Sequence, residues 1–318
     1  MEKKETRIVF MGTPEFAVGS LKALIDNGYN VVGVVTVPDK PSGRGLKMNI
    51  SAVKEYALTL NVPILQPVSL KDEAFLSELK GLDADCFVVV AFRMLPQVVW
   101  SMPHLGTFNL HASLLPQYRG AAPINWAIIN GEKKTGITTF LLDKKIDTGN
   151  ILFQQECDIL EEDNIGSLYD KLMEMGSSLV LKTIDALVSG DVSPIPQQES
   201  EELKPAPKIT RETCKIEWGN SALSISWLIR GLSPYPAAYS TLVSGEKRTD
   251  VKIYAATPCQ EMGNGETGDI YTDGKGRMWV KCKEGSLEIL ELQMAGKKRL
   301  KTKEFLLGVH NIENYRFE

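Results

Sequence analysis

The chain has 318 residues, 43% hydrophobic and 24% charged, which is ordinary for a globular protein and enough for two domains. A net charge of −4 does not suggest a basic nucleic-acid-binding protein, so such a function would have to come from local clusters of cations. No run approaches the roughly 20 apolar residues of a membrane span, and five scattered cysteines and three histidines favour neither a disulfide framework nor a metal centre.

The first 189 residues alternate between expected strands and helices. Their charged start, residues 1–5, has no apolar signal core, so we expect a cytoplasmic protein. The patterns predict strands at 6–11, 29–37, 63–65, 86–91, 107–111, 135–142 and 151–157, and helices at 14–27, 52–60, 72–82, 124–130 and 165–189. Strand–helix–strand order with continuous apolar strands predicts an α/β domain built on a parallel sheet.

Segment 38–47 interrupts this alternation with two prolines, two glycines and the three cations Lys40, Arg44 and Lys47. Prolines and glycines at this density predict a loop. A solvated surface loop is the simpler interpretation. The alternative is a mobile basic finger that reaches for phosphate groups.

The chain changes character after residue 189. Residues 190–207 are rich in proline and polar side chains, without any period, and we interpret them as an interdomain linker. Residues 208–318 are expected to form one helix at 221–230 and about five short strands, which indicates a small β-barrel. The cations of 297–303 are expected beyond its last strand, either as a solvated charge run or as a surface for nucleic acid.

One short strand carries most of the chemistry. In Phe108-Asn109-Leu110-His111, alternate side chains point to opposite faces, so Asn109 and His111 lie side by side on one face. Asp147, in a polar loop between two strands, is the best candidate for a carboxylate partner. An amide, an imidazole and a carboxylate suit the transfer of a carbonyl group to an amine. An accidental Asn-x-His pair and a simple turn at Asp147 remain the alternative.

Several motifs in order carry a resemblance. They are Gly12-Thr13-Pro14, Ser42-Gly43-Arg44-Gly45, Asn109-x-His111-x-Ser113-Leu114-Leu115-Pro116, Arg119-Gly120-Ala121-Ala122-Pro123 and Asp147-Thr148-Gly149. Over essentially its whole length the chain resembles the methionyl-tRNA formyltransferase family of folate-dependent enzymes. This sequence departs from the family pattern at two positions. Ala112 stands where glycine is commoner in the family, and Arg93 replaces a glycine in segment 91–96, which looks one residue shorter than in the commoner form.

The resemblance implies an α/β, Rossmann-like parallel-sheet N-terminal domain (1–189), a linker (190–207) and a small C-terminal OB-like β-barrel that helps bind tRNA (208–318). It implies transfer of the formyl group of 10-formyltetrahydrofolate to the amino group of methionyl initiator tRNA, without a metal, by a protein that we expect to be a monomer. The implied catalytic residues are Asn109, His111 and Asp147. The implied folate-binding residues are Ser113, Leu114, Leu115 and Pro116. The implied tRNA-binding residues are Lys40, Arg44, Lys47, Lys208, Lys297, Lys298 and Arg299.

Three other functions fit parts of the sequence. A nucleotide-sugar amine N-formyltransferase would use the same donor and the same Asn-x-His and Asp groups, but the basic segments favour tRNA. A non-catalytic RNA-binding protein on an inherited enzyme fold is disfavoured by the intact Asn, His and Asp set. A nicotinamide dehydrogenase is disfavoured because Gly12-Thr13-Pro14-Glu15 is not a GxGxxG fingerprint.

Overall fold

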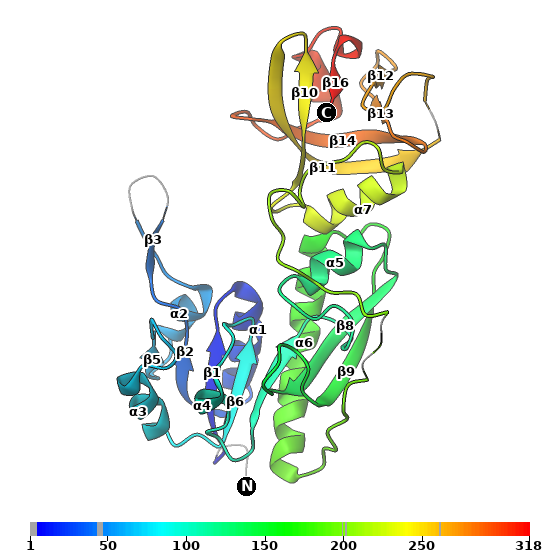
Figure 1. Cartoon of the computed structure of the whole chain (residues 1–318). Helices are drawn as coiled ribbons and strands as arrows, with labels where there is room; N and C mark the ends of the chain where they lie inside the picture. Colours follow the sequence, from blue (N-terminus) through cyan, green and yellow to red (C-terminus); the bar gives the residue numbers. More distant parts are fainter. Residues whose placement is uncertain (1–4, 43–46, 199, 201, 261) are drawn as a thin grey trace. The chain divides into compact units, whose positions relative to one another are not determined.

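The computed structural model describes residues 5–42, 47–198, 200, 202–260 and 262–318 (Figure 1). These residues form two compact units. The first unit comprises Met1–Pro123, Thr135–Asp158 and Tyr169–Pro205, and the second comprises Ile124–Lys134, Ile159–Leu168 and Ala206–Glu318. The units are therefore discontinuous in sequence, unlike the predicted division into 1–189, 190–207 and 208–318.

The first unit is built on a sheet with the strand order β5-β2-β1-β6-β7-β8-β9. Its strands are β1 (Arg7–Gly12), β2 (Asn30–Val35), β5 (Ile64–Leu65), β6 (Cys86–Val90), β7 (Thr107–His111), β8 (Lys134–Leu141) and β9 (Ile151–Asp158). The pairs that join β5, β2, β1, β6 and β7 are all parallel, whereas β8 runs antiparallel to β7. The predicted α/β fold with a parallel sheet is confirmed.

Helices α1 (Glu15–Asp26), α2 (Ala52–Ala57), α3 (Glu73–Gly81), α4 (Gln97–Trp100) and α6 (Ile165–Ser189) connect or follow these strands. Serine and aspartate side chains cap two of them, because Ser51 accepts from the Lys54 amide and Asp72 from the Phe75 amide. Helix α6 packs on the sheet where Gly176 faces Leu110 of β7 and where Thr183 is hydrogen-bonded to Thr139 of β8. The long helix therefore supports the strand that carries Asn109 and His111 from behind.

Segment 38–47 is not the plain loop that its composition predicts. Residues Lys40–Ser42 form β3 and Lys47–Asn49 form β4, and the two pair antiparallel as a hairpin. Strand β3 points away from the other strands of the first unit (Figure 1). Arg44 lies outside the described residues.

The second unit is a strongly bent antiparallel sheet, close to a barrel, with the strand order β12-β13-β14-β11-β10-β16. The strands are β10 (Ala238–Ser244), β11 (Lys247–Cys259), β12 (Ile270–Thr272), β13 (Met278–Lys281), β14 (Ser286–Met294), β15 (Leu300–Lys301) and β16 (Arg316–Phe317). Helices α5 (Pro123–Ile129), α7 (Ala222–Leu232) and α8 (Thr302–Leu307) accompany it. The predicted small β domain is confirmed. The sequence predicts that the cations of 297–303 lie beyond the last strand of the barrel. In the structure they instead precede β15 or lie within β15 and α8.

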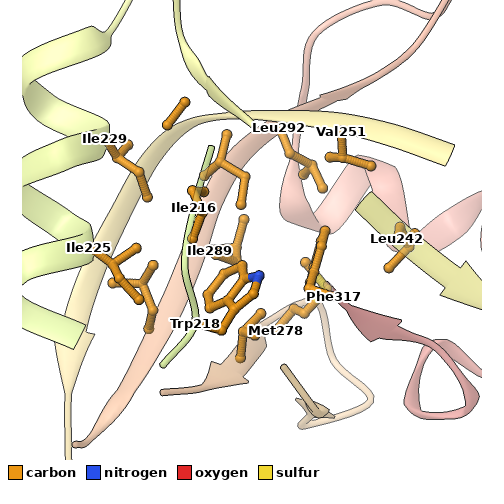
Figure 2. Close-up of a cluster of buried hydrophobic side chains, with 14 of the residues drawn as sticks. Ile216, Trp218, Ile225, Ile229, Leu242, Val251, Met278, Ile289, Leu292 and Phe317 are labelled. Carbon is orange, nitrogen blue, oxygen red and sulfur yellow. The ribbon is translucent and has the colours of Figure 1, made fainter. Parts of the chain in front are cut away.

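The core of this unit joins the sheet to α7. Figure 2 shows Trp218 surrounded by aliphatic side chains of α7 and of strands β10, β11 and β14. Its indole ring lies 5.4 Å from the ring of Phe317, and Nε1 donates to Ser240 Oγ. The apolar face of α7 is thus buried against the apolar face of the antiparallel sheet. Neither unit contains, in its described part, a helix long and apolar enough to cross a membrane.

Candidate active site

His111 is the last residue of β7 and its side chain is almost completely buried. Nε2 lies 2.8 Å from the carbonyl oxygen of Tyr118. Because a carbonyl oxygen can only accept, Nε2 must carry the hydrogen and donate it. The other ring nitrogen, Nδ1, is then the one that can accept or release a proton in the site.

Asp147 faces that second nitrogen from the loop between β8 and β9. Its Oδ2 lies 3.8 Å from His111 Nδ1 and accepts a hydrogen bond of 2.9 Å from the backbone amide of Gly120. The φ angle of Asp147 is +55°, in the left-handed region that costs energy for any residue but glycine. Such a conformation persists only where the surroundings hold it, and here it aims the carboxylate at the imidazole.

Gln197 is the residue that holds this loop. Its amide nitrogen donates to the carbonyl oxygens of Asp147 (2.9 Å) and Gly149 (2.8 Å). Its amide oxygen accepts from Nη2 (2.7 Å) and Nε (3.1 Å) of Arg119. A single side chain therefore connects the segment after β7 to the segment that carries the carboxylate.

Asn109 supplies the third polar group, two residues before His111 on β7. Its Oδ1 is buried and makes no hydrogen bond to any described residue. Buried polar atoms are nearly always paired, so one that lacks a partner in the free protein is available to a ligand. Rotation of the amide by half a turn would present Nδ2, a donor, at the same position.

The predicted folate-binding run lies directly after His111 but is largely committed to the domain itself. Ser113 is fully buried and donates to the carbonyl oxygen of Gln117 at 2.6 Å. Leu115 is buried against Phe140 and Ile151, and its amide donates to Thr138. Leu114 and Pro116 are only partly buried. If the run contacts a ligand, those two side chains are the ones free to do so.

The predicted tRNA-binding cations are scattered in the structure over two separate features. Lys40 and Lys47 belong to the β3–β4 hairpin, and Lys40 is exposed. In the second unit Lys208, Lys297, Lys298 and Arg299 are all exposed. Arg299 is engaged already, since its guanidinium is ion-paired with Glu291 and lies 4.1 Å from the centre of the Tyr254 ring.

A cavity of about 560 Å³ lies in the second unit. Segment 209–214, the start of β10, and the ends of β11 and β14 line it, and its charged residues are Arg211, Asp250 and Lys252. None of the predicted catalytic residues belongs to it. In the described part of the chain, no three His, Cys, Asp or Glu side chains come together as metal ligands.

Sequence reasoning missed Tyr118, Gly120 and Gln197. Tyr118 and Gly120 take part through a backbone carbonyl oxygen and a backbone amide, and the residue type does not predict such contacts. Gln197 lies 50 residues after Asp147, in the segment that its composition marks as a linker. Only the presence of Arg119 and Gly120 in a recognisable motif gave a signal for this part of the site.

Two family models match the chain. The formyl transferase model matches residues 6–184, and the model of the formyl transferase C-terminal domain matches residues 208–310. The methionyl-tRNA formyltransferase of Bacteroides fragilis is 53% identical over 322 aligned positions, covering 100% of this chain and 99% of that protein. The chain belongs to the methionyl-tRNA formyltransferase branch of the formyltransferase family.

Solved structures of lower identity share the fold of this formyltransferase. HypX from Aquifex aeolicus in complex with tetrahydrofolic acid superposes with a TM-score of 0.63 at 18% identity. The match covers 95% of this chain but 47% of HypX, so the chain spans about half the length of that protein. An N-formyltransferase from Helicobacter canadensis, in complex with folinic acid and dTDP-3-aminofucose, gives a TM-score of 0.64 at 19% identity, with 93% of this chain and 100% of that one covered.

Proposed function

We propose that this formyltransferase transfers the formyl group of 10-formyltetrahydrofolate to the free amino group of methionyl initiator tRNA, giving N-formylmethionyl-tRNA for translation initiation. The observation that carries the proposal is the approach of Asp147 Oδ2 to within 3.8 Å of His111 Nδ1 at the end of β7, the strand that also carries the unpaired amide oxygen of Asn109. Full-length similarity to proteins named methionyl-tRNA formyltransferase supports the choice of acceptor. We place the protein in the cytoplasm, as a monomer.

Asn109 stabilises the charge that develops during transfer. When the amine attacks the formyl carbon, negative charge collects on the formyl oxygen. If the amide turns by half a turn, Asn109 presents Nδ2, a donor, where the unpaired Oδ1 lies, and that donor can meet the oxygen. One donor of this kind is worth roughly 3–4 kcal/mol in the transition state.

His111 and Asp147 handle the proton that the amine loses. With Nε2 held by the Tyr118 carbonyl, His111 exchanges protons at Nδ1. A distance of 3.8 Å is too long for a direct hydrogen bond between Nδ1 and Oδ2, but it allows both to contact one amine or one water. The Asp147 carboxylate stabilises the imidazolium when His111 is protonated, and His111 then returns the proton to the departing nitrogen of the donor.

Different residues bind the two substrates. We assign the donor to the run Ser113, Leu114, Leu115 and Pro116, with Leu114 and Pro116 offering partly exposed apolar surface. We assign tRNA to Lys40, Arg44, Lys47, Lys208, Lys297, Lys298 and Arg299. No metal is needed, since proximity and the polar groups of the site supply the chemistry.

A formylation assay with competing acceptors tests the proposal. The full-length chain is supplied with 10-formyltetrahydrofolate and, in separate reactions, methionyl initiator tRNA, methionyl elongator tRNA and a nucleotide-linked amino sugar. Rapid formylation of the initiator alone is expected, and His111→Ala should abolish it. Preferred formylation of the amino sugar would replace the proposal by a nucleotide-sugar N-formyltransferase, and no formylation by the wild-type chain would refute both.

A further inference from the structure

Four loops of the first unit meet at one edge of its sheet. Strands β2, β5, β6 and β7 run parallel to one another and to β1, so the residues that follow them all leave at the carboxyl edge. The strand order turns back between β1 and β6, and open sheets bind ligands beyond the carboxyl ends at such a position. The loop after β6, residues 91–96, therefore borders the same site as His111 at the end of β7.

Arg93 fixes that loop to the segment that follows β5. Its Nη2 donates to the Pro67 carbonyl oxygen at 2.8 Å and its Nη1 to the Val68 carbonyl oxygen at 3.1 Å. The guanidinium also lies over the ring of Phe92, 5.3 Å from its centre. A planar group bound at two points cannot swivel, so the spacing between residues 67–68 and the loop 91–96 is set.

The same short segment is held on its other side by the base of the basic hairpin. The amide nitrogen of Gln66 donates to Asp39 Oδ1 at 2.7 Å and to the Val37 carbonyl oxygen at 2.8 Å. The second carboxylate oxygen of Asp39 accepts from Lys54 of α2. Asp39 immediately precedes β3, so these bonds fix the point from which the hairpin leaves the sheet.

We propose that residues 66–68 form a bridge between the two substrate-binding segments of the enzyme, and that Gln66 and Arg93 are positioning residues for both substrates. The bridge is one continuous stretch of chain. The Gln66 side chain is hydrogen-bonded to the base of the hairpin, and the carbonyl groups of the next two residues accept hydrogen bonds from Arg93. Movement at either end displaces the other. The inference rests on the proposed function, in which the cations of the hairpin contact tRNA and the formyl donor binds beside His111, at the site that the loop 91–96 borders.

Two variants of matched size test the bridge. Gln66→Met and Arg93→Met keep the length of each side chain and remove its hydrogen bonds. Each is expected to raise KM about tenfold for the donor and for the tRNA, with little change in kcat, as the loss of hydrogen bonds to charged groups implies. The double variant is expected to be no worse than the more impaired single variant, because the same connection is broken in both. Arg93→Lys, which can still reach one carbonyl, should recover part of the loss.

Lys71→Met is the matched control, since Lys71 is exposed and lies just beyond the bridge. It should leave both KM values unchanged. The bridge is refuted if Gln66→Met affects only tRNA, Arg93→Met affects only the donor, and the double variant shows the product of the two effects. Unchanged KM values in both single variants would refute it equally.

Hydrogen–deuterium exchange separates failure of the bridge from failure of the proposed function. Arg93→Met should speed exchange of the backbone amides of residues 40, 42 and 47–49, far along the chain from the substitution. Faster exchange there with no tRNA formylation by the wild-type chain would uphold the bridge and reject the function. Unchanged exchange in an active wild-type background would reject the bridge alone. If Arg93→Met does not fold, the reciprocal measurement decides: the exchange of the backbone amides of residues 91–95 in Gln66→Met.

Discussion

Asn109 and His111 of β7 and Asp147 of the loop between β8 and β9 differ in how the fold holds each side chain. Asn109 keeps one end of a buried amide unpaired, His111 has one nitrogen tied to a carbonyl, and Asp147 sits in a strained backbone conformation. The unpaired amide oxygen and the strained backbone each cost folding free energy, roughly 1–3 kcal/mol apiece, whereas the hydrogen bond of His111 stabilises the fold. In the mechanism that we propose, groups held in this way need little rearrangement when the substrates bind.

Substitution at each of these positions should separate their roles. His111→Ala is expected to lower kcat by about 100-fold to 10,000-fold, the usual contribution of a positioned acid or base. Asn109→Ala should lower it by about 100-fold to 1,000-fold, as the loss of one donor to an oxyanion does. Steady-state formylation assays check both, with circular dichroism to verify folding. A kcat within about threefold of wild type in either variant would remove that residue from the mechanism.

The conformation of the loop between β8 and β9, which carries Asp147, depends on the absence of a side chain at Gly149. A Cβ built there would lie 1.7 Å from the Leu141 carbonyl oxygen, which is backbone and cannot turn aside. Gly81, at the end of α3, has open space around it and an ordinary backbone. The two glycines therefore form a matched pair.

Gly149→Ala should force the loop from the end of β8 and carry Asp147 away from His111. We expect a loss of stability of roughly 1–3 kcal/mol, typical of overpacking, and a fall in kcat. Gly81→Ala should leave activity intact and stabilise the helix by about 0.5–1 kcal/mol. Thermal unfolding and formylation rates measure the two effects. Equal behaviour of the two variants would contradict the account of the loop.

Sequence patterns predicted those elements whose structure depends on local periodicity. The alternation around Asn109 and His111 placed both on one strand, and the spacing of apolar residues in 165–189 predicted the bounds of α6 correctly. The hairpin at 40–49 and the attachment of Gln197 could not be predicted in this way. The hairpin depends on pairing between its own two short strands, and Gln197 on hydrogen bonds to residues far along the chain. Proline-rich or polar composition gives no sign of either.

The molecule as a whole is acidic, so we expect its affinity for tRNA to come from local groups of cations. Lys297 and Lys298 are exposed, and no ion pair is found for either within the described residues, whereas Arg299 is paired with Glu291. Binding of methionyl-tRNA should weaken steeply with salt, because each phosphate that a cation neutralises releases counterions.

The slope of log affinity against log salt should reflect this difference. The double substitution Lys297→Ala with Lys298→Ala should reduce the slope by roughly 1–2, close to one unit for each phosphate that is no longer neutralised. Arg299→Ala should change it less, since that guanidinium is partly neutralised in the free protein. Filter binding between low and moderate salt would measure the slopes. An identical slope for the wild type and the double variant would remove these lysines from the interface.

The discontinuity of the second unit has a consequence for how the gene can be divided. Segment 124–134 comes early in the chain, yet it packs on α7: Asn125 donates to the Gly231 carbonyl, and Gly131 lies against the Trp227 ring. A fragment that stops at residue 207 would leave the apolar side of α5 bare to water, inviting aggregation or capture by chaperones. Recombination at a single junction near residue 207 would not exchange the whole second unit, because segments 124–134 and 159–168 would stay behind. A fusion protein joined at that residue would lack the same segments.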